Sequence, residues 1–299
     1  RTKTKKTVAP KENMSQIPAV VSKVKYANNE ITIDADIPEA IGSNFFFIFI
    51  WVFLFIGLYT VMELKKPLDF LKNLQKELDK LYVKKSKSKV LVRNKSKFNY
   101  NPVTNFDKYF EKFIRFSIIK KFPNDSIIGE EFKNKNSNSY YQWSIDPIDG
   151  TKAFVIGVPT WSNLIGLSFK NKSLIGLANF PGLNKFYIND KKNAYVFKKN
   201  KKVKLNTSKN NNLNSVKILG NFHGNISLKK QKKIFKRCGK SFRNISYDAL
   251  SYCLLAEGKI DAVIETNLKP YDIIPLIPII KKAGGVITTW ANEPAENGG

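Results

Sequence analysis

The spacing of apolar residues changes along the chain, and each change predicts a different kind of element. No charged residue occurs between Ala40 and Met62, and about 20 apolar residues are what an α-helix needs to cross a bilayer. This run is therefore a candidate membrane span. After it, leucines recur every three or four residues, which predicts an amphipathic helix with one apolar stripe. The stripe consists of Leu64, Leu68, Leu71, Leu74, Leu78 and Leu81.

Helical and strand-like patterns alternate further along the chain. Residues 101–122 predict a helix that is capped near Thr104 and ends before Pro123. The segment 271–285 predicts another helix, with prolines inside it and a Gly-Gly stop. This mixture predicts an α/β (α+β) protein in which helices and a mixed sheet form layers. Strands are expected at 89–93, 126–132, 141–146 and 215–222, hairpins at 160–181 and 193–205, and a buried helix at 248–258.

The first 61 residues differ in composition from the rest. Residues 1–16 are basic and polar, and residues 28–40 form a short, acidic, strand-like stretch before the apolar run. We expect residues 1–61 to be a separate upstream piece, either a membrane anchor or sequence that does not belong to the functional protein. Contact with a membrane is expected only if residues 44–61 are a genuine span. The functional domain is then expected at 62–299, truncated at its C-terminus.

The net charge of the chain suggests a polyanionic partner, but the distribution of the basic residues does not support one. The formal net charge is +27, from 51 basic and 24 acidic residues, which would ordinarily indicate nucleic acid or an anionic membrane. The lysines are scattered among asparagines and isoleucines, and no basic stretch alternates with stacking aromatic residues. We therefore expect a solvated lysine surface without specific nucleic-acid binding, which would still steer an anionic substrate.

Cysteine and histidine are too scarce for several common kinds of site. Cys238 and Cys253 are the only cysteines, and neither lies in a CxxC motif, so a zinc site or disulfide framework is not expected and a reducing cytoplasm is the default. His223 is the sole histidine and lies in a loop-like context. Any Ser-His-Asp or Cys-His mechanism would depend on this one residue, and we interpret it as a surface or partly packed histidine.

The stretch WSIDPIDGTKAF brings acids, a turn and a helix start together. Asp146 ends a strand, Pro147 keeps that residue extended, and Asp149 then points back toward the same side. Gly150 allows close approach of the backbone, and Thr151 opens the next segment with free N–H groups. Hard oxygen ligands suit Mg²⁺ and N–H groups at a helix start suit phosphate. An ordinary Asx turn is the alternative interpretation of the spacing.

Three further acidic positions could complete such a site: Glu130 with Glu131, Asp107 and Asp272, each at the edge of an apolar run. Unpaired buried carboxylates are costly, so several of them converging on one place would imply a cation. Scattered over a surface they would imply nothing, and Asp107 and Glu131 in particular could be plain solvated carboxylates.

These motifs together resemble the inositol monophosphatase family of Mg²⁺-dependent phosphomonoesterases. The resemblance rests on GEE, DPIDGT and a late Asp before a helix that ends in AGG, in that order, and covers the chain from Leu64 to its end. The segments NPVTNFD and LKPYD look most like the histidinol-phosphatase branch of the family. The resemblance implies a layered αβαβα sandwich, two or more bound Mg²⁺ ions and no covalent intermediate.

The resemblance also implies roles for individual residues. Glu130 and Thr151, with Asp107 behind the threonine hydroxyl, would orient and deprotonate the attacking water. The N–H groups of Gly150 and Thr151 would bind the phosphate, and the carboxylates of Asp248 and Glu265 would contact the organic part of the substrate. The implied metal ligands are Glu130, Asp146, the carbonyl of Ile148, Asp149 and Asp272.

The expected reaction is hydrolysis of L-histidinol phosphate to L-histidinol and phosphate, a step of histidine biosynthesis. A carboxylate at Asp248 would suit the cationic amino group of that substrate. Within the same family, the alternatives are an inositol monophosphatase or a 3'-nucleotide phosphatase with the same metals. In a different class, the alternative is a membrane-anchored binding protein whose active site is no longer catalytic. Asp248 and Glu265 could instead cap a helix or pair with a lysine. A homodimer is an open alternative to a monomer.

Overall fold

The structure, a computed structural model, describes residues 23–27, 30–34, 44–95, 100, 102–199, 201–210, 212, 215–222, 226–238, 242–243 and 245–298, with side chains from residue 64 onward except at 242. His223 and the basic segment 1–16 lie outside the described residues. The chain divides into two units, residues 1–60 and 61–299. The first contains an antiparallel pair of strands, β1 (Lys23–Ala27) and β2 (Glu30–Asp34), and β2 confirms the strand expected there.

Helix α1 (Asn44–Lys85) contains the predicted leucine stripe. Leu71 and Leu78 of the stripe are fully buried, as expected for the apolar face of a helix that packs on a sheet. The expected membrane span, residues 40–62, falls on a stretch whose side chains the structure does not describe. Within the part of the chain that is described, no helix combines the length and apolarity needed to cross a membrane.

A seven-stranded sheet forms the centre of the second unit. Its strand order is β11-β10-β9-β8-β7-β6-β5, and every neighbouring pair is antiparallel except β5 with β6. Both predicted hairpins are confirmed, as β7–β8 and β10–β11. The strands are β5 (Ser126–Gly129), β6 (Tyr141–Asp149), β7 (Ser162–Phe169), β8 (Lys172–Phe180), β9 (Lys185–Asn189), β10 (Ala194–Lys198) and β11 (Lys201–Lys204).

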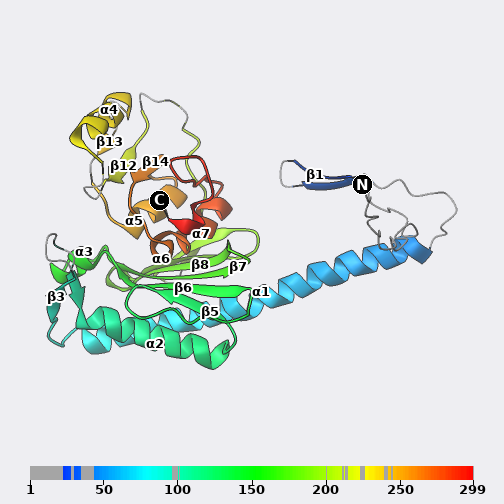
Figure 1. Ribbon diagram of the computed structural model, residues 1–299, viewed down its shortest axis with the longest axis horizontal. Coiled ribbons are helices and arrows are strands. Elements are labelled where there is room, and N and C mark those ends of the chain that lie inside the picture. The colour runs from blue at the N-terminus through cyan, green and yellow to red at the C-terminus, as the bar shows by residue number, and fades with distance from the viewer. Residues whose placement is uncertain are drawn as a thin grey trace, which may run out of the picture. The chain divides into compact units, whose positions relative to one another are not determined.

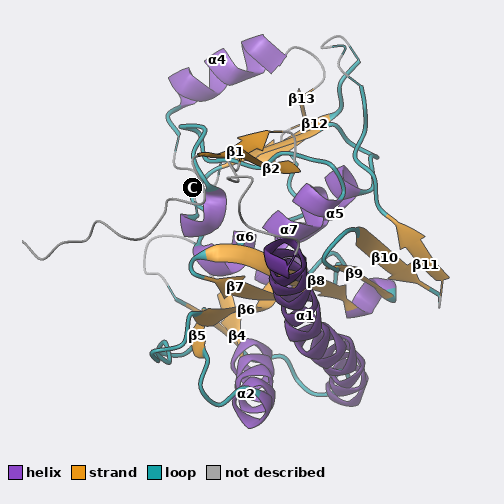
Figure 2. Cartoon of the chain, turned by 90° about the vertical axis from the view of Figure 1, so that its right-hand side faces the viewer, coloured by secondary structure: helices purple, strands orange, loops and turns teal. Residues whose placement is uncertain are grey.

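Helices and a second sheet cover this sheet in layers, which confirms the expected αβαβα arrangement (Figures 1 and 2). The part of α1 from residue 61 onward lies with α2 on one face, and α5, α6 and α7 lie on the other. A parallel sheet of order β13-β12-β14 follows, with α4 outside it. These elements are α2 (Asn105–Lys121), β12 (Ile218–Asn221), α4 (Leu228–Cys238), β13 (Phe242–Arg243), α5 (Ala249–Ala256), β14 (Ala262–Glu265), α6 (Pro270–Ile273) and α7 (Leu276–Lys282).

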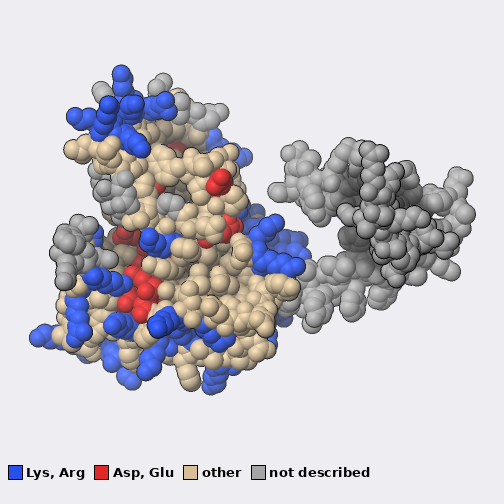
Figure 3. Space-filling view, in the orientation of Figure 1, with Lys and Arg blue, Asp and Glu red and all other residues tan. Residues whose placement is uncertain are grey.

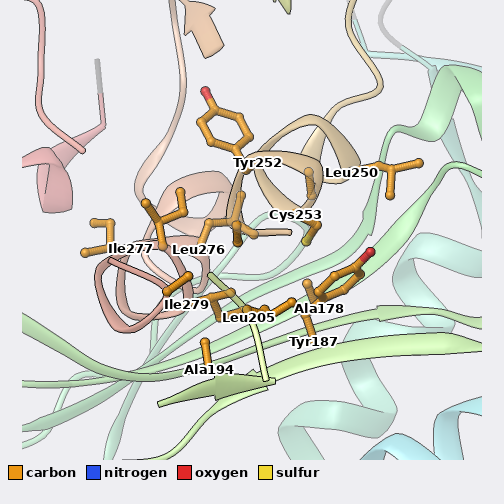
Figure 4. Close-up of a cluster of buried hydrophobic side chains, with 14 of the residues drawn as sticks. Ala178, Tyr187, Ala194, Leu205, Leu250, Tyr252, Cys253, Leu276, Ile277 and Ile279 are labelled. Atoms are coloured by element: carbon orange, nitrogen blue, oxygen red, sulfur yellow. The ribbon is translucent and has the colours of Figure 1, made fainter. Parts of the chain in front are cut away.

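Alternation along the strands separates two apolar cores. In β8, Ile175 and Leu177 belong to the core beneath α1 and α2, whereas Ala178 and Phe180 belong to the core beneath α5 and α7. Figure 4 shows the second core, where side chains of the helices pack onto the sheet. Full burial of one Leu, Ile or Phe side chain is worth about 1.5–3 kcal/mol, so both sheet faces contribute to stability.

Small elements at one end of the large sheet frame the site. The antiparallel pair β3 (Val92–Asn94) and β4 (Pro102–Thr104) leads directly into α2. Thr104 is the N-cap of α2 and forms a capping box with Asp107, which confirms the predicted cap. The short helix α3 (Thr151–Val155) follows β6 directly, and the 3₁₀ turns η1 (Pro181–Leu183) and η3 (Ala295–Asn297) lie further along the chain.

The helix expected over 271–285 is corrected by the structure to two short helices, α6 and α7, which are separated at Ile274 and Pro275. Pro275 has no N–H to donate to the preceding turn, so the helix cannot continue regularly through it. The bend lies directly on the sheet. A Cβ added to Gly176 of β8 would be 1.6 Å from the carbonyl oxygen of Pro275, so only glycine lets the bend between α6 and α7 approach β8 this closely.

Candidate active site

The DPIDGT turn (Asp146–Thr151) joins the end of β6 to the start of α3. Its pairing with β7 is irregular between Asp146 and Asp149, and the N–H of Ile148 donates to Asp146 Oδ1 at 3.0 Å. Gly150 has a φ of +79°, which L-residues with a side chain adopt at a cost. A Cβ at Gly150 would also lie 2.7 Å from Asp248 Oδ2, so glycine is required on two independent grounds.

A cavity of about 520 Å³ opens above this turn. The predicted residues that line it come from β5–β6, the DPIDGT turn, the start of α5, the end of β14 and α6, so segments far apart in the sequence converge there. Asp107 does not line the cavity, but its Oδ1 accepts a hydrogen bond from Thr151 Oγ1 at 3.3 Å, which places it behind the threonine. The lining residues among those predicted are Glu130, Asp146, Ile148, Asp149, Gly150, Thr151, Asp248, Glu265 and Asp272.

Three acids near the end of β5 form a tight group, of which Glu130 lines the cavity. Carboxylate oxygens of Asp107, Glu130 and Glu131 all lie within 4.8 Å of one another. Lys95, which follows β3, donates from Nζ to Glu130 Oε1 at 2.8 Å and also pairs with Glu131. Figure 3 shows acidic side chains gathered in a small area beside β3 and α3, on a face otherwise dotted with lysines.

Burial and mutual repulsion make the charged forms of these acids costly. Burial and the charge of Glu130 raise the pKa of Asp146 well above its ordinary value, and burial with the charge of Asp248 does the same to the pKa of Asp149. Burial also raises the pKa of Asp272 to about 7. Although burial opposes the charged form of Lys95, the two glutamates raise its pKa. Such shifts are typical of functional sites.

Asp149 and Asp272, like Asp146, are held by backbone N–H groups. Asp149 Oδ2 accepts from the N–H of Ala249 at 2.7 Å, at the start of α5, and Asp272 Oδ2 accepts from the N–H of Lys269 at 2.7 Å. In each case one carboxylate oxygen is fixed by the fold. Asp149 and Asp272 are thus oriented by elements on the far side of the cavity, across from the DPIDGT turn.

Two further carboxylates lie on the side of the cavity formed by α5 and β14. Glu265 Oε1 accepts from Ser246 Oγ at 2.6 Å and its Oε2 accepts from the Tyr252 hydroxyl at 3.0 Å, while burial raises its pKa to about 7. Ser246 also accepts a hydrogen bond from the N–H of Asp248 at 3.0 Å. Asp248 itself has a φ of +49°, a strained backbone of the kind that collects at functional sites.

The sequence reasoning did not identify two residues that contact the acidic group. Glu111 is fully buried in α2, pairs with Arg115 at 2.7 Å and accepts from the N–H of Glu131 at 2.6 Å. It therefore fixes the loop that carries Glu130. Lys95 is the second, and nothing distinguished it among so many lysines. The signal for Glu111 was a glutamate on the apolar face of a predicted helix, four residues after Asp107.

The donor set fits a divalent cation better than any other common group. Its members are carboxylate and carbonyl oxygens, the ligands preferred by Mg²⁺ and Ca²⁺. Among the described residues no lysine or arginine pairs with Asp146 or Asp149, so a bound cation would remove the repulsion that raises their pKa values. Thr151 and the N–H groups at the start of α3 border the same space.

Solved structures share this fold. Staphylococcal IMPase-I complexed with products superposes with a TM-score of 0.69 at 20% identity, covering 78% of this chain and 87% of that one. An IMPase/NADP phosphatase complexed with Mg²⁺ and phosphate gives a TM-score of 0.69 at 20% identity, covering 79% and 88%. At these identities the likeness establishes the fold.

The sequence places the chain in a family. The model of the inositol monophosphatase family matches residues 64–298, so the chain belongs to this family of metal-dependent phosphatases, which hydrolyse phosphate monoesters. This confirms the resemblance given by the motifs.

Individual relatives carry different names. The chloroplastic bifunctional phosphatase IMPL2 of Arabidopsis thaliana is 33% identical over 205 residues, which cover 66% of this chain but only 57% of that protein. Fructose-1,6-bisphosphatase/inositol-1-monophosphatase of Aquifex aeolicus is 35% identical, over 62% of this chain and 71% of its own. Histidinol-phosphatase of Mycobacterium tuberculosis is 29% identical, over 70% and 82%.

Proposed function

We propose that residues 62–299 form a Mg²⁺-dependent phosphomonoesterase that hydrolyses L-histidinol phosphate to L-histidinol and phosphate in histidine biosynthesis. The observation that carries this substrate is the pair of carboxylates, Asp248 and Glu265, which line the same cavity as the DPIDGT turn. A substrate with a cationic amino group beside its phosphate would place that cation against them. Histidinol-phosphatases among the relatives support the proposal.

In this proposal the acids divide into two sets by position. Glu130, Asp146, Asp149, Asp272 and the carbonyl of Ile148 would hold two or more Mg²⁺ ions, whereas the α5 and β14 side would select the organic group. Bound Mg²⁺ would lower the pKa of the attacking water and neutralise charge on the phosphoryl oxygens. The N–H groups of Gly150 and Thr151 bind phosphate oxygens, as free N–H groups at a helix start do.

Thr151 links the attacking water to an acid. Its hydroxyl has one proton and two acceptors within reach, the carbonyl of Ile148 at 2.9 Å and Asp107 Oδ1 at 3.3 Å. Its lone pairs remain free to accept from water. The water donates a hydrogen bond to Thr151, and Thr151 donates one to Asp107. Glu130 is the second group that orients and deprotonates the water. Burial raises the pKa of Asp107 to about 6, which favours its use as a proton acceptor near neutral pH.

The alternative substrate is inositol 1-phosphate, whose neutral hydroxyl groups could also donate to Asp248 and Glu265. The name of the Aquifex aeolicus relative favours it. The two substrates differ in the charge of the organic group, because only histidinol phosphate would place a positive charge beside the two carboxylates.

A substrate panel with an Asp248→Asn variant separates the two. We expect kcat/KM for L-histidinol phosphate to exceed that for inositol 1-phosphate and adenosine 3',5'-bisphosphate by about tenfold or more, the size of one charge-assisted hydrogen bond. Asp248→Asn should raise KM for histidinol phosphate by a similar factor and leave KM for inositol 1-phosphate within about twofold. Asp190→Asn, a carboxylate between β9 and β10 that does not line the cavity, is the matched control. Equal rates on the panel, or equal effects of Asp248→Asn on both substrates, would remove the histidinol assignment.

The compartment proposed for this activity is the cytoplasm. Cys238 and Cys253 are both free thiols in the structure, as a reducing compartment requires. Cys253 is fully buried and burial raises its pKa, so it acts as a packing residue. Reduction of the purified protein should leave its activity unchanged.

A further inference from the structure

A chain of hydrogen-bonded side chains lies behind the DPIDGT turn, within the layer between the sheet and α1. Asn163 of β7 and Asn179 of β8 lie directly opposite each other in the strand register, and both are buried, at 0% and 1% exposure. Asn163 Nδ2 donates to the carbonyl oxygen of Pro147 at 2.7 Å. Asn179 Nδ2 donates both to Asn163 Oδ1 at 3.1 Å and to Asp79 Oδ1 of α1 at 2.9 Å. We call Asn163, Asn179 and Asp79 the amide chain.

The carboxylate at its end sets the direction of every hydrogen bond in the amide chain. Ionised Asp79 can only accept, so Asn179 must present its N–H groups toward it. The second N–H of Asn179 then meets Asn163 Oδ1, which leaves the N–H groups of Asn163 facing Pro147. Gln75 Nε2 donates to Asp79 and to Asn179 Oδ1 at 3.3 Å, so the outer end is fixed as well.

The amide chain acts on a peptide of the turn whose orientation the ring of Pro147 does not fix. The φ of Pro147 is fixed by its ring, so the remaining freedom before Ile148 is rotation of the Pro147–Ile148 peptide plane. The N–H of that peptide donates to Asp146 Oδ1 at 3.0 Å, and its carbonyl accepts from Asn163 at 2.7 Å. Rotation would break both hydrogen bonds and leave a buried amide donor without its acceptor, at a cost of about 1–3 kcal/mol.

We propose that Asn163, held by Asn179 and Asp79, is a positioning residue that keeps the Pro147–Ile148 peptide, and with it the proposed metal ligands Asp146, Ile148 and Asp149, in the orientation in which these three residues line the cavity. The residue touches neither substrate nor cation and acts through the backbone of the turn. The proposal rests on the magnesium ligands of the proposed function and is independent of which phosphate monoester is hydrolysed.

The test compares two buried asparagines of the same sheet. Asn189 of β9 is also at 0% exposure, accepts from the N–H of Gly176 at 2.8 Å and donates to the carbonyl of Leu174 at 2.9 Å, but it does not contact the turn. Asn163→Ala and Asn189→Ala should therefore lose comparable stability, about 1–3 kcal/mol each. Their effects on the metal site should differ.

The readout is the Kd of Mg²⁺ measured by isothermal titration calorimetry on the folded, metal-stripped protein without substrate. We expect Asn163→Ala to raise this Kd about 10–100-fold, the range for residues that support metal ligands, and Asn189→Ala to leave it within about twofold of wild type. An unchanged Kd in Asn163→Ala, or an equal rise in both variants, would overturn the proposal.

A milder substitution serves if Asn163→Ala does not fold. Asn179→Ser removes the hydrogen bond that Asn179 donates to Asn163 Oδ1 but keeps the hydrogen bond from Asn163 to the carbonyl of Pro147. The variant therefore tests whether Asn163 must itself be held by Asn179. A severalfold weaker Mg²⁺ affinity in the folded variant supports the proposal, and an unchanged affinity contradicts it. If wild-type protein itself binds no Mg²⁺, the proposed metal site is wrong and the role of Asn163 falls with it.

Discussion

Two groups of buried polar side chains lie on opposite sides of the DPIDGT turn, and their hydrogen-bonding capacities are balanced in opposite ways. In the cavity, acceptors face acceptors: Asp146 and Asp149 repel their neighbours, and burial with this repulsion raises their pKa values. In the amide chain, the side-chain nitrogen of Asn163 donates to one acceptor and that of Asn179 donates to two. The amide chain is complete within the fold, whereas the cavity becomes balanced only when a cation binds.

The largest expected effect comes from removing one charge in the cavity. Asp149→Asn should lower metal-dependent phosphatase activity by more than about 100-fold, beyond the range for supporting residues. In EDTA the same variant should be more stable than wild type because it removes a repelling charge. A gain of 1 kcal/mol would raise Tm by about 2–4 °C in a domain of this size. The activity is measured by phosphate release and the Tm by thermal unfolding.

The matched substitution in the amide chain should have the opposite sign. Asp79→Asn keeps one acceptor but turns an amide N–H toward the donors of Gln75 and Asn179, so its Tm in EDTA should fall. If Asp149→Asn and Asp79→Asn shift Tm in the same direction, the cavity and the amide chain do not differ in how their donors and acceptors are balanced.

The second prediction concerns pH. Asp272 has a pKa of about 7 and Asp107 of about 6 in the folded protein, above the values of about 4 expected in the unfolded chain. Between these limits the folded state binds more protons, so its stability falls as pH rises from about 4 to 7. The same sign holds for Asp149, whose pKa is raised further.

A comparison between variants isolates this effect from the background of a highly basic chain. The Tm advantage of Asp149→Asn over wild type, both in EDTA, should widen as pH rises from 5 to 8. Stabilisation of wild type by a fixed Mg²⁺ concentration should grow over the same interval because the ligands must be deprotonated. An advantage that narrows with pH would show that the acids do not repel one another in the folded state.

The smallest expected effect is that of Lys95→Met. Lys95 pairs with Glu130 and Glu131 and so competes with a metal ion for the same oxygens. A partly exposed pair of this kind is worth about 0–1 kcal/mol, so removing it should lower the Kd of Mg²⁺ by up to about fivefold. Lys152→Met, which changes a lysine that lines the cavity but pairs with neither glutamate, should alter the Kd less. Weaker binding in Lys95→Met would mean that the lysine supports the site.

The sequence predicted the local features of this protein well. The Thr104 cap, the two hairpins and the glycine of the DPIDGT turn are each set by residues close together in the chain, and the structure shows them in place. The family motifs added the long-range step, by associating Glu130 with Asp272. The prediction of one helix over 271–285 was wrong in detail, because Pro275 lacks the N–H that a continuous helix needs and interrupts it despite the apolar pattern around it.

The supporting residues could not be predicted because their signals are not local. Asp79 and Asn179 are 100 residues apart in sequence, and an asparagine in a strand pattern gives no sign of whether it will be buried. Glu111 and Lys95 likewise depend on loops that fold back from elsewhere. Residue type was informative for the cavity, where acids are unusual at the edges of apolar runs, and uninformative for the groups that hold those acids in place.

The most direct test of the account is phosphate release from L-histidinol phosphate by the purified protein, with Mg²⁺ and with EDTA, beside the Asp149→Asn variant. The account predicts turnover that requires Mg²⁺ and is lost in the variant. Turnover in EDTA, or turnover that Asp149→Asn leaves unchanged, would contradict the central claim that the carboxylates of this cavity work by holding metal ions.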